Sequence, residues 1–414
     1  FFFKQKPEYE MLRSLVGSEM CIRDSIEAGH DIGSGGLITS LLEMCFPTSS
    51  LGMTLDFSSF EEQDLIKILF SEKSAVLLQS REDLTSHFEK KGITVYKIGE
   101  VTNRSIMRIN ELEIEITQMR TKWMATSKAL EMYQTSIDLA EKRTENAVNQ
   151  PLKFKFPEGF KGTLPLPKKE RIKAAVLREK GSNSEREMAY IMNKAGFEVV
   201  DIHMTDLMSG KENLDEIKFL VAVGGFSNSD VLGSAKGWAG SFIYNENARN
   251  SLKKFFSKED TLSLGVCNGC QLFMELGLIY PELEIHPKMH HNDSKKFECQ
   301  FTAVSIKTNN SVMFKNFENT TLGIWAAHGE GKFIFDKKES DYNIIGKYHK
   351  SSYPANPNGS DYNAAMLSSK NGRHLVMMPH LERSSFPWNW AYYPENRKTD
   401  EISPWIIPFQ NAYK

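Results

Sequence analysis

The chain has 414 residues, 40% of them hydrophobic, so it can bury substantial cores, and its length predicts two or three domains. Its 51 Lys and Arg residues nearly balance its 53 Asp and Glu residues, which argues against a protein that binds nucleic acid or a membrane surface through its overall charge. No apolar run approaches the roughly 18 residues that a membrane-spanning helix needs.

The cysteines indicate the redox compartment. They are few, odd in number and irregularly spaced, which favours a reduced, cytoplasmic protein over a disulfide framework. The five are Cys21, Cys45, Cys267, Cys270 and Cys299.

The first residues differ in character from the rest. The chain starts with Phe1-Phe2-Phe3 and no initiator Met, and the stretch 14–25 resembles translated sequencing adapter. We therefore expect residues 1–25 to be a non-native leader and the sequence from Ile26 onward to be a fragment of a longer protein.

Residues 26–118 are predicted to form an α+β unit. Asp31 and the glycine-rich turn Gly33–Gly36 precede a helix over 37–44, a pattern that fits either a metal or phosphate site or a plain glycine-lined turn with a capping Asp. The later pattern predicts further elements. These are strands over 74–79 and 94–99, a helix over 81–91, and a hairpin of 106–109 with 111–116.

Residues 119–170 are predicted to be a helix followed by a connector. The apolar positions of 120–149 have helical spacing and include Trp123 and Tyr133. Prolines then recur among lysines and glycines, and a helix cannot run through them, so we place a domain boundary there. They are Pro151, Pro157, Pro165 and Pro167.

Residues 171–414 alternate between short apolar strands and helices. This rhythm predicts a parallel sheet covered by helices on both faces, with the functional crevice beyond the C-terminal ends of the strands. The predicted strands are 172–178, 197–202, 219–223 and 262–266, and the predicted helices are 184–195 and 248–256.

Cys267 is the first candidate for chemistry. It lies between Gly265 and Gly269, after an apolar strand and before a helix-compatible segment that begins at Gln271. Flanking glycines allow a sharp turn that exposes a nucleophile, and a helix N-terminus favours the reactive thiolate. A buried structural cysteine is the plain alternative, so partner residues must decide.

His380 and Glu382 are the candidate partners. They belong to the stretch 373–383, which is predicted to be a strand that runs into a loop, and in an extended chain residues two apart point to the same side. A thiol, an imidazole and a carboxylate make up the nucleophile, base and orienting group of acyl transfer through a thioester.

These motifs resemble those of class I glutamine amidotransferases. The stretches 265–271 and 378–383 resemble the cysteine and histidine motifs of that family. Three further stretches are similar to the phosphoribosylformylglycinamidine synthase family, at 178–188, 224–238 and 325–331. The resemblance extends from about Ile26 to the end of the chain. It implies the tail of an ATP-binding, synthetase-type half-domain followed by a complete glutaminase domain.

The resemblance also implies roles for individual residues. Cys267 would attack the glutamine side-chain amide, His380 would transfer the protons, and Glu382 would orient the imidazole. Leu381 stands where the family has proline, which removes a backbone constraint but no catalytic group. The remaining implied residues are oxyanion-hole N–H groups and glutamine contacts. They are Gly225, Phe226 and Asn268 for the first, and Gln271, His328 and Glu330 for the second.

The implied reaction needs a second half. Ammonia from glutamine would serve the ATP- and Mg²⁺-dependent conversion of formylglycinamide ribonucleotide to its amidine in purine biosynthesis, whereas glutamine hydrolysis itself needs no cofactor. Asp31 corresponds to a Mg²⁺ ligand of the family. Gly33 and Ser34 replace a serine and an aspartate of the family's motif, which weakens nucleotide and metal binding by this half.

Three alternatives remain. Cys267 and Cys270 form a Cys-x-x-Cys pair that suits thiol redox chemistry. A binding module whose glutaminase activity has decayed would retain the same motifs. A zinc site from both cysteines with His290 and His291 is disfavoured, because adjacent histidines rarely bind one ion well.

Overall fold

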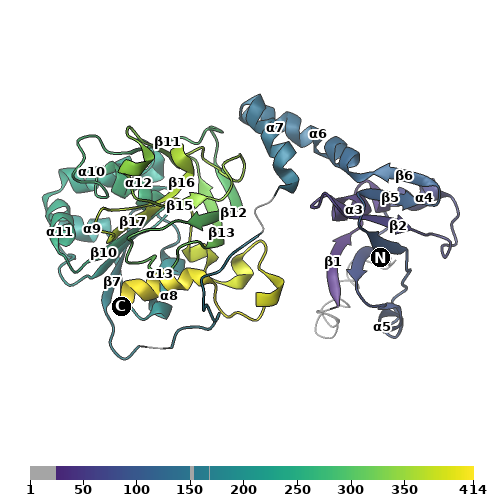
Figure 1. Cartoon of the computed structure of the whole chain (residues 1–414), viewed down its shortest axis with the longest axis horizontal. Helices are drawn as coiled ribbons and strands as arrows, with labels where there is room; N and C mark the ends of the chain where they lie inside the picture. The colour runs from purple at the N-terminus through teal and green to yellow at the C-terminus, as the bar shows by residue number, and fades with distance from the viewer. Residues whose placement is uncertain (1–24, 150–152, 167) are drawn as a thin grey trace. The chain divides into compact units, whose positions relative to one another are not determined.

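The structure is a computed structural model that describes residues 25–149, 153–166 and 168–414 (Figure 1). All but the last residue of the predicted leader, and with them Cys21, lie outside the described residues. The chain divides into two compact units, residues 1–132 with 144–149 and residues 133–143 with 150–414. This division differs from the domain boundaries predicted at residues 118 and 170, which remain a prediction.

The first unit is an α+β body around a four-stranded sheet of order β4-β2-β5-β6. Apolar side chains from the sheet pack with those of α3, and Met53, Leu77 and Met107 are almost fully buried. A two-stranded sheet of β1 and β3 completes it. The bounds are β1 Ile26–Asp31, α3 Gly36–Cys45, β2 Gly52–Leu55, α4 Leu65–Leu69, β3 Val76–Ser80, α5 Thr85–Glu89, β4 Gly99–Thr102, β5 Ile106–Ile109 and β6 Leu112–Glu115.

Two expectations for this unit are wrong. Residues 94–98 form no strand, although Ile98 is fully buried; the strand β4 begins only at Gly99. The helix expected over 81–91 shrinks to α5. Burial of an apolar side chain from an irregular segment produces the same sequence signal as a strand.

The helical stretch predicted over 120–149 is confirmed, as two helices, α6 Ile116–Gln134 and α7 Ile137–Glu145. Ile116 belongs to the core of the first unit and Ala140 is fully buried, but other apolar positions of these helices are exposed. The exposed fraction is 53% for Trp123 and 91% for Tyr133.

The second unit is built on a nine-stranded sheet of order β13-β12-β15-β16-β17-β10-β9-β7-β8. Strands β8, β7, β9 and β10 run parallel, as predicted, and β17 joins them as a fifth parallel strand that the pattern did not assign to this sheet. The sheet continues antiparallel from β17 through β16, β15, β12 and β13, which the alternating pattern did not predict. The bounds are β7 Lys173–Arg178, β8 Glu198–His203, β9 Phe219–Ala222, β10 Leu262–Val266, β12 Glu298–Ile306, β13 Thr321–His328, β15 Ile344–Tyr348, β16 Ala364–Ser368 and β17 His374–Met377.

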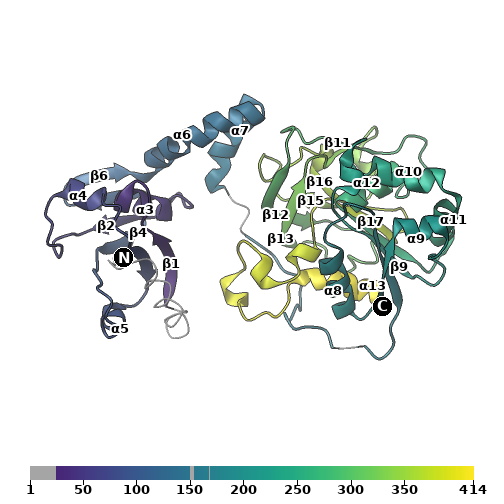
Figure 2. The same ribbon diagram turned by 180° about the vertical axis from the view of Figure 1, so that it is seen from behind.

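Helices cover both faces of this sheet. Figures 1 and 2 show α8 and α13 on one face and α10, α11 and α12 on the other. Fully buried Phe197, Phe219 and Phe273 belong to the resulting core. The bounds are α8 Glu185–Ala195, α9 Met204–Ser209, α10 Lys236–Tyr244, α11 Glu246–Ser257, α12 Asn268–Glu275 and α13 Ile407–Tyr413.

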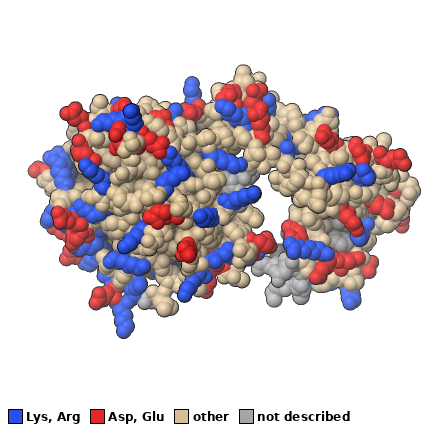
Figure 3. Space-filling view, in the orientation of Figure 1, with Lys and Arg blue, Asp and Glu red and all other residues tan. Residues whose placement is uncertain are grey.

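The surface carries charges of both signs. Basic and acidic side chains interleave over the face shown in Figure 3, as expected from 51 basic and 53 acidic residues. Across the described residues, no helix combines the length and apolar character needed to cross a membrane.

Candidate active site

Cys267 lies in a strained turn between β10 and α12. Its backbone angles are φ 52° and ψ −105°, a conformation that non-glycine residues rarely adopt. Two close backbone approaches fix the turn: a Cβ at Gly265 would lie 2.5 Å from the Gly269 carbonyl oxygen, and a Cβ at Gly269 would collide with the Ala222 carbonyl. The two glycines therefore serve the geometry that the sequence predicted.

The register of the sheet brings His380 to Cys267. Val266 pairs with Met377 in the parallel ladder of β10 and β17, so both strands end at one edge of the sheet. The N–H of His380 donates to the Trp325 carbonyl at 2.8 Å and fixes the loop that follows β17. A Cβ on Gly224 would lie 2.8 Å from His380 Cε1, so the glycine makes room for the imidazole.

Glu382 completes the group. Its Oε1 lies 2.6 Å from His380 Nδ1, and both residues are buried. The prediction that an extended chain makes this contact is wrong. Leu381 is helical at φ −70°, and Glu382 begins a 3₁₀ turn over Glu382–Ser384. The turn folds the carboxylate back onto the imidazole.

Burial and charge act in opposite directions on this pair. Burial lowers the pKa of His380, but the Glu382 carboxylate and the neighbouring Cys267 raise it by more, and the net shift is upward. Burial raises the pKa of Glu382, whereas His380 and Arg383 lower it, and the net shift is downward. Glu382 therefore stabilises the imidazolium whenever His380 takes up a second proton, with Nδ1 turned to the carboxylate.

The predicted oxyanion-hole groups differ in availability. The N–H of Phe226 donates to the Gly181 carbonyl at 2.9 Å, so it is occupied in this structure. Within the described part of the chain, the N–H groups of Gly225 and Asn268 have no hydrogen-bond partner. Gly225 has φ +127°, which only glycine adopts readily. Two of the three predicted groups are thus free to bind an anion.

The residues predicted to contact glutamine surround one cavity of about 260 Å³ next to Cys267. His328 is buried there, with Nδ1 3.2 Å from Asn292 Oδ1, and its Nε2 has no partner among the described residues. Burial, with the charge of His380, lowers the pKa of His328 to about 3, so its imidazole is neutral.

Gln271 is engaged within the protein. Its Nε2 donates to the Glu330 carbonyl at 2.7 Å, and its Oε1 accepts from Asn268 Nδ2 at 3.0 Å. The Asn268 side chain in turn accepts from the Ser227 N–H at 3.3 Å. Gln271 therefore positions Asn268 and the Glu330 segment.

Two further polar residues, Asp230 and Ser234, line the same cavity. Sequence reasoning missed them, although both belong to the 224–238 stretch that carries the resemblance. The pattern alone does not tell which of its polar side chains face a cavity.

The other thiols give no support to redox or zinc chemistry. Cys270 is fully buried, and burial, together with the nearby Cys267, raises its thiol pKa well above the usual value. The described part of the chain contains no group of three or more His, Cys, Asp and Glu side chains arranged to hold a metal ion, and the side chain of His291 is 76% exposed.

The glycine-rich turn near Asp31 does not form a metal or phosphate site. The Asp31 side chain is 88% exposed, and His30 Nε2 pairs with Glu43 at 3.0 Å. The N–H of Gly35, which could bind a phosphate, donates instead to Glu72 at 2.9 Å. The residues present therefore do not fit Mg²⁺ or a phosphate.

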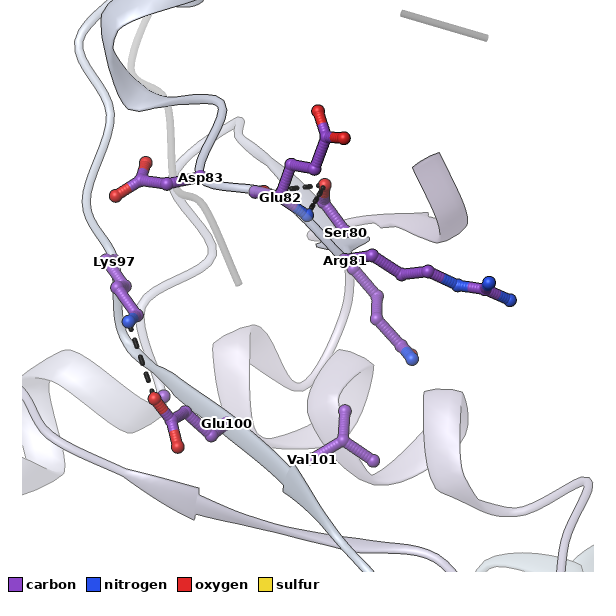
Figure 4. A pocket seen from close by; sticks show the side chains of 9 residues that line it. Ser80, Arg81, Glu82, Asp83, Lys97, Glu100 and Val101 are labelled. Carbon is purple, nitrogen blue, oxygen red and sulfur yellow. Dashed lines mark hydrogen bonds and ion pairs between the residues drawn. The ribbon is translucent and has the colours of Figure 1, made fainter. Parts of the chain in front are cut away.

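A pocket of about 300 Å³ in the first unit is lined by charged side chains of both signs, and both of its basic side chains are already in ion pairs (Figure 4). Lys97 pairs with Glu100 at 3.4 Å, and Arg81 pairs with Glu27 at 2.6 Å. Asp31 does not line this pocket.

Comparison with known proteins gives two family matches. Residues 171–414 match the CobB/CobQ-like glutamine amidotransferase domain, and residues 4–110 match the C-terminal domain of AIR synthase related protein. The second match begins inside the predicted leader, whose origin stays a prediction.

Similarity to individual proteins extends over nearly the whole chain. The probable phosphoribosylformylglycinamidine synthase, chloroplastic/mitochondrial, of Arabidopsis thaliana is 37% identical over 94% of this chain and 30% of its own length. The phosphoribosylformylglycinamidine synthase of Drosophila melanogaster is 34% identical over 98% of this chain and 33% of its own length. The chain thus spans about a third of these relatives. Among solved structures, PurLQS from Thermotoga maritima aligns with 58% of this chain and 98% of its own, with 24% identity and a TM-score of 0.46.

The predicted resemblance and fold class are confirmed by the match over 171–414, which covers more than half of the 414 residues and contains Cys267, His380 and Glu382. The chain belongs to the CobB/CobQ-like glutamine amidotransferase family.

Proposed function

We propose that residues 171–414 hydrolyse glutamine through a thioester on Cys267 and supply ammonia for a phosphoribosylformylglycinamidine synthase reaction. The observation that carries this proposal is the assembly of Cys267, His380 and Glu382, from two adjacent parallel strand ends, around one strained turn. Nearly full-length similarity to proteins named phosphoribosylformylglycinamidine synthase supports the choice of reaction.

Acylation begins with the Cys267 thiol. Its proton moves to Nε2 of His380, and the Glu382 carboxylate at 2.6 Å stabilises the resulting imidazolium. The Cys267 sulfur then bonds to the amide carbon of glutamine. The amide oxygen becomes an oxyanion, which the N–H groups of Gly225 and Asn268 would bind, an effect worth about 3–4 kcal/mol per donor.

The tetrahedral intermediate then collapses. The imidazolium of His380 returns its proton to the amide nitrogen, the C–N bond breaks, and ammonia leaves a glutamyl thioester on Cys267. Water, deprotonated by His380, attacks the thioester carbon. Glutamate leaves, and the Cys267 thiol is restored.

The ammonia would serve a second reaction. We infer that it converts formylglycinamide ribonucleotide to the amidine in an ATP- and Mg²⁺-dependent step that needs parts of the relatives beyond the third that this chain spans. Asp31 has no part in the proposed glutamine hydrolysis, since its surroundings do not fit a metal ion. A cytoplasmic location fits the absence of disulfides among the described cysteines.

Glutamine hydrolysis by the purified chain tests this proposal. Cys267→Ala and His380→Ala should each lower kcat/KM by about 1000-fold or more. Cys299→Ala, which removes an exposed free cysteine, should leave the rate unchanged. Full activity in either site variant would refute the assignment, and amidine formation by this chain alone would contradict the need for a longer enzyme.

A further inference from the structure

Helix α7 carries an arginine that pairs with the unit containing Cys267. The amidotransferase match begins at residue 171, but residues 133–143 already belong to the second unit, and Ala140 is fully buried. Near the end of this helix, the Arg143 guanidinium lies 2.6 Å from Glu298 Oε2. A segment that precedes the proline-bearing connector therefore supplies a positive charge to the second unit.

The carboxylate of this pair is buried and has a second donor. The Glu298 side chain is only 4% exposed, and the Tyr353 hydroxyl donates to its Oε1 at 2.8 Å. Arg143 Nη2 donates to the same hydroxyl, and the guanidinium lies 4.8 Å from the centroid of the Tyr353 ring. Burial, and then Glu298, raise the pKa of Tyr353, so its hydroxyl stays protonated. Because a buried carboxylate that loses its cation is strongly destabilised, Arg143 determines where Glu298 can lie.

Glu298 adjoins one wall of the cavity beside Cys267. It begins β12, and its backbone pairs with that of His328 in the ladder of β12 and β13. The three residues before it, 295–297, line the cavity of about 260 Å³, and so does His328. Cys267, in contrast, follows β10 in the parallel part of the sheet. Loss of Arg143 should therefore displace one wall of the cavity and leave the reacting thiol in place.

We infer that Arg143 is a positioning residue for glutamine binding, because through Glu298 it holds the segment 295–297 that forms one wall of the cavity. The inference rests on the proposed function, since it takes glutamine as the molecule that enters the cavity. It makes part of α7 a working part of the glutaminase, although this helix lies before the connector and outside the matched residues 171–414.

A second cluster of the same chemistry provides a matched control. Arg397 Nε lies 2.9 Å from Asp400 Oδ2, and the Asp400 side chain is 6% exposed. The Tyr393 hydroxyl donates to the same carboxylate at 2.8 Å, and the Arg397 guanidinium lies 5.0 Å from the centroid of the Phe160 ring. The described residues that line the cavity include none of these four. Loss of either arginine should lower the free energy of unfolding, but only loss of Arg143 should affect the cavity.

The test compares glutamine hydrolysis by the wild type, Arg143→Met and Arg397→Met. Arg143→Met should raise KM about 10-fold with kcat within about threefold, whereas Arg397→Met should change neither constant. The double variant Arg143→Met/Glu298→Gln removes the buried charge together with its partner, so its KM should return to within about threefold of the wild-type value. Arg143→Lys keeps the charge but loses the forked contact, and it should raise KM about threefold, which allows the comparison even if Arg143→Met does not fold.

Amide hydrogen exchange measures the cavity wall without any substrate. Peptides that cover residues 295–300 should exchange about 10-fold faster in Arg143→Met than in the wild type, and at the wild-type rate in Arg397→Met. Unchanged exchange or an unchanged KM in Arg143→Met, or equal changes in Arg397→Met, would overturn the inference. If exchange responds as expected but the wild type hydrolyses no glutamine, only the proposed function is contradicted.

Discussion

Glu382 reaches the imidazole of His380 through a turn of the backbone, with 2.6 Å between Oε1 and Nδ1 and both side chains buried. The strand before them sets only where the loop starts; the 3₁₀ turn at Glu382–Ser384 sets where the carboxylate points. The local backbone geometry of this turn thus holds the two buried side chains together.

Glu382→Gln should lower kcat for glutamine hydrolysis by about 100-fold or more, with a smaller effect on KM. The neutral amide cannot stabilise the imidazolium that forms when His380 takes the thiol proton. Steady-state kinetics check this expectation. Glu187→Gln is the control, because that carboxylate is half exposed beside Arg383 and faces solvent. A wild-type kcat in Glu382→Gln would remove the carboxylate from the mechanism.

Cys270→Ala should retain glutaminase activity within about threefold. The thiol is fully buried on α12, and its raised pKa keeps it protonated and inert. The substitution should lower the free energy of unfolding by about 1 kcal/mol through lost packing. Activity and denaturant unfolding measured on one preparation test both parts. Loss of activity with normal stability would revive a role for the Cys267–Cys270 pair.

Gly269→Ala should prevent the second unit from folding or destabilise it by several kcal/mol. The added methyl group would collide with the backbone carbonyl of Ala222, which belongs to the central sheet and cannot move away. Gly240→Ala is the matched control, since its Cβ would meet only Tyr244 Cδ2 at 3.9 Å within α10. That change should be neutral or add up to about 1 kcal/mol of helix stability. Thermal unfolding of the two variants gives the comparison, and equal effects would contradict the close-approach argument.

Protonation of the buried His374 should lower the free energy of unfolding of the protein in mild acid. It is buried with Nδ1 3.0 Å from Ser263 Oγ, and burial, aided by the Arg373 charge, lowers its pKa to about 4. In the unfolded chain the His374 imidazole is protonated near pH 6.5, whereas in the folded protein it is protonated only near pH 4. Stability is therefore lost as pH falls through this window, by at most about 1.4 kcal/mol per pH unit for one histidine.

Urea unfolding at several pH values, in wild type and His374→Gln, measures this slope. The variant should lose less stability between pH 6.5 and pH 4, while His328, shifted in the same direction, continues to contribute in both proteins. Identical pH dependence in the two proteins would show that His374 is not the group responsible.

The predictable parts of the site are those encoded by local signals. The apolar strand, the flanking glycines and Cys267 form one contiguous pattern that can be read from the sequence. The pairing of β17 beside β10, which brings His380 near Cys267, is known only from the structure. The orientation of Glu382 was anticipated for the wrong reason, since nothing in the sequence distinguishes an extended His-x-Glu from one that turns at Leu381.

Other features of the fold and the site depend on contacts between distant segments, and no local sequence pattern predicts them. The antiparallel half of the sheet, from β16 to β13, is set by which strands pair, and strand pattern alone does not determine partners. The N–H of Phe226, predicted to bind the oxyanion, instead donates a hydrogen bond to the carbonyl of Gly181, which is distant in the sequence. Asp230 is identified as a residue of the site by its position in the lining of the cavity, which the sequence does not indicate.

The most direct measurement is acid quenching of the protein during turnover of isotope-labelled glutamine, followed by mass spectrometry of its peptides. A labelled glutamyl group is expected on the peptide that contains Cys267, removable by hydroxylamine and absent in Cys267→Ala. Active hydrolysis with the label on another residue would contradict the central claim that Cys267 is the nucleophile.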